Sequence, residues 1–267
     1  ECLTLIENIK FKTAIQRMEA GSLVQNAGCD FTAQGDLTLT DKELAPKNLM
    51  VNFEMCKLQL LQSWEALQMR AGAWNNGDTP SFTEYAISLM AKNIASGIET
   101  AIWNGATLTN GSFQGFTTAT TGTFAGSDPA TVATLTAPFT ATNIIANIET
   151  VIEAIPTAVL GSEDLRSYRD YISAISKLGY LNAYNMQSDY VPVVNGIKVC
   201  VVNGMLDDQI VAAEMSNLFF GTDLVSDSTE IRILDMSDLD GSNNIRMVAK
   251  YTGGVQHGVG ADIVWGK

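Results

Sequence analysis

The chain has 267 residues, of which 46% are hydrophobic and 17% are charged, so it can bury a sizeable core as one large domain or two smaller ones. Acidic residues outnumber basic ones by 29 to 16, and the formal charge of -13 disfavours broad binding to nucleic acid phosphates. The four cysteines, at positions 2, 29, 56 and 200, lack the spacing of a zinc site, and no apolar run approaches the roughly 18 residues of a membrane span.

Roughly the first fifty residues are predicted to form a long two-stranded extension, which has too few apolar side chains to form a core by itself. Glycine and asparagine interrupt residues 21–36, and residues 37–40 then alternate between apolar and polar side chains as a half-buried strand does. The alternation resumes at residues 49–53, after a polar break around Pro46. Because an isolated two-stranded ribbon is marginal in water, we expect this segment to lie against something else.

The next segment is predicted to be helical. Residues 53–69 repeat apolar side chains at helical spacing, and Asn75-Asn76-Gly77 follows as a break. The apolar positions of this segment are Leu58, Leu61, Trp64 and Leu67.

A long amphipathic helix over residues 81–104 is the element around which the chain is organised. Ser81 and Glu84 form a capping box at its start, and Gly105 supplies a C-cap at its end. The apolar residues recur at spacings of three and four, at Phe82, Tyr85, Ala86, Leu89, Met90, Ile94, Ile98, Ala101 and Ile102. Ile94→Asp is therefore expected to abolish folding, whereas Lys92→Ala on the opposite face is expected to be nearly silent.

After this helix comes a glycine- and threonine-rich surface stretch, and helices and strands alternate from Thr140 onward. Residues 142–155 are predicted to form a helix that Pro156 stops, and Ser162 is predicted to cap a second helix running towards Gly179. A hairpin is predicted at residues 193–199, because Asn195-Gly196 lies between alternating apolar residues. Further strands are predicted at residues 157–160, 218–220 and 229–234 and in the alternating segment 245–265. The pattern indicates mixed α and β structure, with a compact unit inserted between the long helix and the closing strands.

No coherent catalytic or metal site is predicted. His257 is the one imidazole and has no flanking nucleophile signature, so we interpret it as structural. Asp238 and Asp240 belong to an incomplete calcium loop, since Met236 and Met247 occupy two ligand positions. We therefore predict no catalytic, cofactor-binding or metal-binding residues. Their absence from the sequence favours a structural or binding role over an enzymatic one.

Two parts of the sequence resemble a known family. Residues 98–105 read IETAIWNG and residues 110–116 read NGSFQGF, while residues 245–256 read IRMVAKYTGGVQ and residues 261–265 read ADIVW. The first part is similar to the end of the spine helix and the glycine-bearing segment after it in tailed-bacteriophage (Caudoviricetes) major capsid proteins of the Hong Kong ninety-seven type. The second part is similar to the long strand with which those proteins return beside the spine.

The resemblance implies an α+β fold and a structural function. Its expected parts are an N-terminal arm (1–9), an extended β-ribbon loop (10–55), a peripheral domain with the spine helix at 81–104 (56–139), an axial domain (140–240) and return strands of the peripheral domain (241–267). It implies a non-enzymatic major capsid subunit that forms hexamers and pentamers of an icosahedral shell, with portal and decoration proteins as partners. Such a shell encloses double-stranded DNA without sequence-specific binding, is assembled in the bacterial host cytoplasm, and uses no cofactor and no membrane.

The N-terminal segment is the expected contact between subunits. It is apolar enough to need a partner but too sparse to fold alone, so we expect it to reach over an adjacent subunit through Phe31, Leu37, Leu39 and Leu44. Some relatives crosslink a lysine of this loop, and Lys42 and Lys47 lie in the right region, but no partner is identifiable and no crosslink is predicted. Glu1 at the start fits either residues missing before it or a leader removed by a maturation protease, which the resemblance makes a reasonable expectation.

Two other interpretations stay open at this point. An encapsulin-like compartment would use the same fold to enclose a cargo enzyme, and a secreted β-rich binding module or a hydrolase with an unrecognised site would belong to another class. A particle seen in negative stain would favour a shell, and nucleic acid inside the particle would favour a phage.

Overall fold

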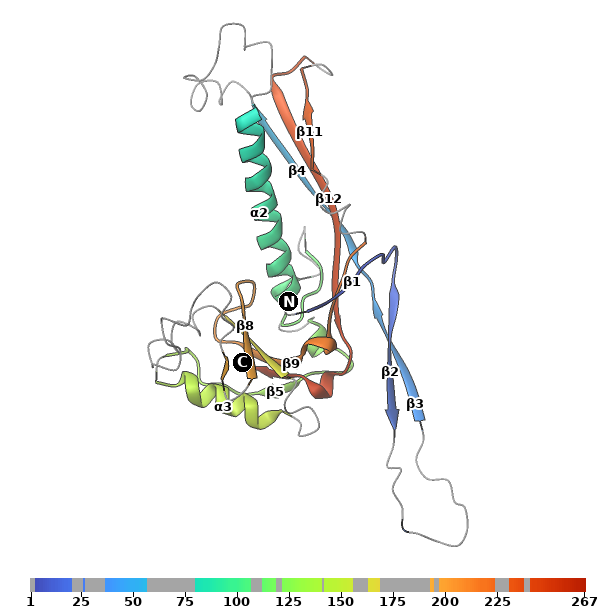
Figure 1. The fold of residues 1–267 in the computed structure, drawn as a ribbon, viewed down its shortest axis with the longest axis vertical. Helices are drawn as coiled ribbons and strands as arrows, with labels where there is room; N and C mark the ends of the chain where they lie inside the picture. Colours follow the sequence, from blue (N-terminus) through green and yellow to red (C-terminus); the bar gives the residue numbers. More distant parts are fainter. Residues whose placement is uncertain are drawn as a thin grey trace.

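The chain is described by a computed structural model covering residues 3–20, 26, 37–56, 80–106, 112–118, 122–140, 142–155, 163–168, 193–194, 197–223, 231–237 and 241–267. The molecule is elongated (Figure 1). A compact body contains α3, β5, β8 and β9, and the long helix α2 extends from it beside the long strands β4 and β12. The ribbon of β2 and β3 projects on the side of these strands away from the body.

The long helix α2 spans Pro80–Asn104, which confirms the predicted spine. It ends where the Gly105 N–H donates to the carbonyl of Ala101 at 3.0 Å. The side chains of Ser81 and Glu84, which the predicted capping box needs, lie outside the described residues. The apolar stripe is half-buried from Met90 onward and fully buried only in the last turn.

A five-stranded sheet runs beside α2 (Figure 1). Its longest strand, β12 (Asn244–His257), pairs antiparallel with β4 (Lys47–Cys56), β11 (Ile231–Asp235) and β10 (Leu218–Gly221), and β1 (Thr4–Ile6) pairs parallel with β10. The predicted alternation of β12 is confirmed, because Ile245, Met247 and Ala249 are buried while Arg246 and Lys250 are exposed.

The predicted helix over residues 53–69 is wrong at its start. Residues 53–56 continue strand β4, where Phe53 is paired with Met247 and Cys56 with Asn244. A strand partner almost two hundred positions away along the chain overrides the local helical spacing. Residues 57–69 lie outside the described residues.

A six-stranded sheet forms the body, in the order β5-β13-β9-β6-β8-β7. Helix α3 (Ile144–Ala154) lies on it and buries Ile144, Ile148 and Val151, which confirms the helix predicted at residues 142–155. The strands span Thr131–Ala133 (β5), Val264–Gly266 (β13), Ile210–Glu214 (β9), Glu163–Tyr168 (β6), Ile197–Val202 (β8) and Val193–Val194 (β7). Three short 3₁₀ turns lie in the described chain, at Thr123–Ala125 (η2), Met215–Asn217 (η4) and Gly260–Asp262 (η5).

The helix predicted to start at Ser162 is a second correction, because Glu163–Tyr168 is strand β6. This strand pairs with β8 on one side and β9 on the other. A central position in a sheet satisfies the backbone on both edges, and that outweighs a local capping signal. The hairpin predicted at residues 193–199 is confirmed, since Val194 and Ile197 are antiparallel partners. The strand predicted at residues 157–160 lies outside the described residues.

The core of the body is aromatic. It is built by Trp103, Phe113, Phe116, Phe124 and Trp265, all exposed by 2% or less. The glycines after the helix allow this packing: a Cβ on Gly105 would lie 2.2 Å from the carbonyl oxygen of Phe113, and the Gly115 N–H donates to the carbonyl of Gly105 at 2.8 Å.

The predicted part boundaries cut across these sheets. Strands β5 and β13, expected in the peripheral domain, pair in the same sheet as β6, β8 and β9 of the expected axial region. Strand β4, expected in the extended loop, pairs along its whole length with β12. The sheets therefore do not end where the composition of the sequence changes.

Candidate assembly surfaces

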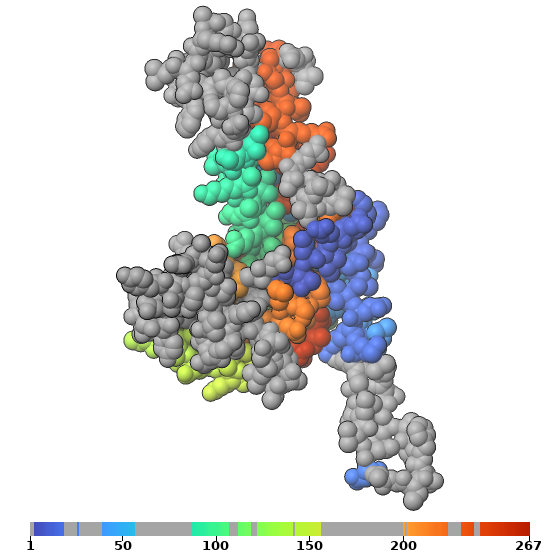
Figure 2. Space-filling view, viewed as in Figure 1, coloured from blue at the N-terminus to red at the C-terminus, as the bar shows by residue number. Residues whose placement is uncertain are grey.

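The ribbon is made of β2 (Thr13–Ala20) and β3 (Leu37–Leu44), an antiparallel pair. The blue segments of the N-terminal region lie along one side of the molecule in Figure 2. One face of the ribbon points outward and carries Met18 and Leu39, which are direct cross-strand partners. They are 65% and 58% exposed. Two large apolar side chains side by side on a polar ribbon form a surface suited to contact with another molecule.

The structure treats the four predicted contact residues differently. Leu39 is exposed as a contact residue must be, whereas Leu44 is only 1% exposed and packs inside its own chain against Ile9 and Gly221. This corrects the expectation for Leu44, because a side chain sealed in its own core has no surface left for a neighbour. Phe31 and the side chain of Leu37 lie outside the described residues. Met18, which the prediction missed, becomes visible only through the register of the two strands.

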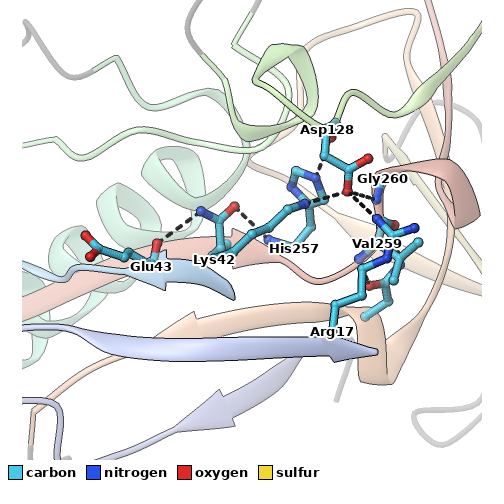
Figure 3. A network of polar contacts seen from close by, with 9 residues as sticks. Arg17, Lys42, Glu43, Asp128, His257, Val259 and Gly260 are labelled. Atoms are coloured by element: carbon cyan, nitrogen blue, oxygen red, sulfur yellow. Dashed lines mark hydrogen bonds and ion pairs between the residues drawn. The ribbon is translucent and has the colours of Figure 1, made fainter. Parts of the chain in front are cut away.

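The other face of the ribbon meets the body at a polar joint (Figure 3). The carboxylate oxygen Oδ2 of Asp128 accepts from Lys42 Nζ at 2.7 Å, from Arg17 Nη1 at 3.1 Å and from the Gly260 N–H at 2.8 Å. These donors come from β3, β2 and η5, so one oxygen joins both ribbon strands to the body. We call Arg17, Lys42, Asp128 and Gly260 the root joint. No signal in the sequence pointed to it, since Asp128 lies in an irregular loop.

Electrostatics favour the charged form of Asp128. Burial acts to raise the pKa of its carboxyl, but the hydrogen bonds from Lys42 and Gly260 and the charges of Lys42 and Arg17 outweigh burial, so the pKa lies below the usual 3.8. The carboxylate is therefore ionised at neutral pH. It faces two cations, and all three side chains are less than a third exposed.

His257 lies beside the joint and is neutral. Its Nε2 is 2.9 Å from the backbone oxygen of Asp128, and because a carbonyl only accepts, Nε2 carries the ring proton. Burial, with Lys42 close by, lowers its pKa to about 4. The ring also meets the edge of Phe124, with centroids 5.7 Å apart. These contacts fit the predicted structural role of His257 and offer no nucleophile for it to activate.

A groove lies between α2 and the sheet. It is a cavity of about 380 Å³ lined almost entirely by apolar side chains. The lining includes Val51 and Phe53 of β4, Met90, Ile94 and Gly97 of α2, and Met247 of β12. A Cβ added at Gly97 would meet no atom within 4 Å, so the middle of the helix is loosely packed on its sheet side.

Other kinds of site are not evident in the described part of the chain. No group of three or more His, Cys, Asp or Glu side chains could hold a metal ion among the described residues. Among those same residues, none of the helices has the length and apolar character needed to cross a membrane. Cys56 is free and half-buried, whereas Cys200 is disulfide-bonded.

Comparisons with known proteins identify the fold. No protein-family model matches the chain, and no curated protein matches it significantly in sequence. Solved structures do match. A capsid chain of an empty GTA particle has a TM-score of 0.63 at 13% sequence identity, and the match covers 100% of this chain and 87% of the GTA chain. A chain of the satellite phage P4 procapsid has a TM-score of 0.61 at 11% identity, and the match covers 98% of this chain and 84% of the procapsid chain. A chain from Mycobacterium phage Che8 has a TM-score of 0.56 at 16% identity, and the match covers 97% of this chain and 85% of the Che8 chain.

These likenesses extend over nearly the whole chain, so the α+β fold is that of phage and GTA capsid proteins, the Hong Kong ninety-seven type. The resemblance seen in residues 98–116 and 245–265 is thus confirmed for the fold. Sequence identities of 11 to 16% show a shared fold and do not by themselves show a shared function.

Proposed function

We propose that this chain is a major capsid subunit of a tailed bacteriophage or a related particle, a structural protein that forms an icosahedral shell around double-stranded DNA. The observation that carries the proposal is the match of nearly its full length to chains described as capsid or procapsid. The acidic charge of -13 is compatible, because a shell encloses DNA without having to bind it tightly.

The ribbon is the proposed contact between subunits. Its outward pair, Met18 and Leu39, would lie on an adjacent copy of the chain and cover apolar surface that is exposed in the single subunit. A head-to-tail contact of this kind repeats around a closed ring, which fits hexamers and pentamers. The body, the part built from α2 and the five-stranded sheet, and the ribbon would then take the axial, peripheral and extended-loop roles of the family. Portal and decoration proteins are the further partners proposed.

The test of the contact uses matched charge variants of the ribbon. Met18→Lys and Leu39→Lys place a charge on the proposed interface, whereas Gln16→Lys adds the same charge on the same outward face, opposite Asp41. We expect the first two to leave unassembled subunits and the third to assemble normally, as judged by negative-stain microscopy and sedimentation. Equal assembly of all three would remove the ribbon from the proposed interface.

The contents of the particle test the function itself. Nuclease-protected double-stranded DNA inside purified particles supports the phage shell. Particles that enclose protein cargo and no nucleic acid would instead identify an encapsulin-like compartment. A chain that never assembles under any condition would overturn the proposal of a shell.

A further inference from the structure

The ribbon meets the body over a short stretch at its root. Leu44 packs against Ile9 and Gly221 beside the five-stranded sheet, and Gln256 Nε2 of β12 donates to the backbone oxygen of Glu43 at 3.1 Å. These contacts hold the last residues of β3. The root joint lies further along the ribbon, and it takes one side chain from each strand, Arg17 and Lys42.

The geometry of the joint fixes a direction. Both cations end on the same oxygen of Asp128, and that oxygen is also held by the Gly260 N–H of the body. Swinging the ribbon away would break both ion pairs together and leave two cations without their carboxylate. Because the side chains are 18 to 26% exposed, water compensates for that loss only in part.

A second ion pair on the ribbon provides the contrast. Lys12 and Glu43 are bonded to each other, but their side chains are 60% and 64% exposed, and Glu43 is itself part of β3. A pair so exposed contributes little, and it does not reach the body. Of the ion pairs described in β2 and β3, those to Asp128 are the ones that connect the ribbon strands to the body.

We propose that Asp128 is a positioning residue that clamps the ribbon in one direction relative to the body, and that its negative charge rather than its shape holds the clamp. An asparagine at this position has nearly the same shape and still accepts a hydrogen bond, but it removes the negative charge that faces Lys42 and Arg17. Among the described contacts, those of Glu43 and Leu44 at the base of the ribbon then remain, and an isolated two-stranded ribbon is marginal in water.

The test is hydrogen–deuterium exchange on the full-length, unassembled chain. Asp128→Asn is expected to speed exchange in β2 and β3 by about tenfold or more while leaving α3 of the body within about twofold. The matched control, Glu43→Gln, removes the exposed ion pair and is expected to leave exchange in both regions unchanged. Unchanged exchange in the ribbon of Asp128→Asn, or an equal rise in α3, would overturn the clamp.

A second substitution separates charge from shape. In the Asp128→Asn background, Lys42→Met removes one of the two cations that face position 128, so we expect it to slow ribbon exchange again. If the double variant exchanges as fast as Asp128→Asn or faster, charge does not hold the clamp. The measurement needs no assembly, so the clamp can fail while the proposed shell function stands, and the reverse also holds.

Discussion

The two ends of helix α2 show opposite kinds of packing. At its C-terminal end Trp103 is 1% exposed and its ring lies 5.5 Å from that of Phe116, inside a closed aromatic core. In its first half, Ile87 and Leu89 are 36% and 46% exposed, and the helix borders an open groove. Among the described residues, the core cluster at this end has Ile245 and Met247 as its buried members.

This difference shows that one helix serves two regions with different requirements. The body buries its own apolar surface and has what a domain needs to fold alone. The arm, made of the first half of α2 with β4, β11 and most of β12, keeps apolar surface uncovered, so its stability depends on what is placed against it. If the chain is the shell subunit proposed above, this division would let it fold first and become rigid on assembly.

A buried charge gives the largest contrast between the regions. Ile148 of α3 is 1% exposed in the body, and Ile148→Asp is expected to abolish folding. Ile94 is half-buried beside the groove, where an aspartate reaches water, so Ile94→Asp is expected to cost only about 1–3 kcal/mol. This revises the expectation from sequence alone. Denaturant unfolding measures both, and equal losses would show that the arm is as closed as the body.

Truncation of large side chains gives the next largest effect. Trp103→Ala is expected to cost about 3–5 kcal/mol, because it opens a cavity in the aromatic core. Leu89→Ala, on the same helix but 46% exposed, is expected to cost less than about 1 kcal/mol. Thermal unfolding of the two variants beside Lys92→Ala, the nearly silent control, measures the contrast, which would vanish if the whole helix packed uniformly.

Acid weakens the body through His257. Its pKa is about 4 in the folded chain against 6.5 in the unfolded chain, so the unfolded chain takes up the proton first as the pH falls. The stabilisation is complete above pH 6.5 and is lost towards pH 4, by about 3 kcal/mol at 1.36 kcal/mol per unit. His257→Gln is expected to flatten stability between pH 6.5 and 4 relative to the parent chain. Asp128 does not contribute in this window, since its pKa lies below 3.8.

The smallest predicted effect has the opposite sign. Gly97 lies inside α2 with no atom within 4 Å of an added Cβ, so Gly97→Ala is expected to stabilise the arm by up to about 1 kcal/mol. Slower exchange of α2 amides near residue 97, with α3 unchanged as the control, would confirm it. A loss of stability would mean that the groove is narrower than the structure has it.

The parts of the fold that sequence predicted are those whose pattern is local. The spine helix, the hairpin at residues 193–199 and the alternation of β12 follow from periodicity and turn residues within one segment. Strand β6 was mistaken for a helix because its partners, β8 and β9, are distant in sequence. The root joint was missed for the same reason, since Asp128 and Lys42 meet only through the tertiary fold. Leu39 is exposed and stays a predicted contact, whereas Leu44 was misjudged, because apolarity alone does not tell which face of a ribbon is buried.

The position of β13 has a consequence for the order in which the chain becomes structured. This strand, Val264–Gly266, lies between β5 and β9, and the first strand, β1, pairs with residues 219–221. The edge strand β5 is joined to the rest of the body sheet through β13, so β5 cannot take its place until residues 264–266 have been synthesised. Pairings over such separations close slowly, and during that interval the unpaired strand edges are open to pairing with another copy of the chain.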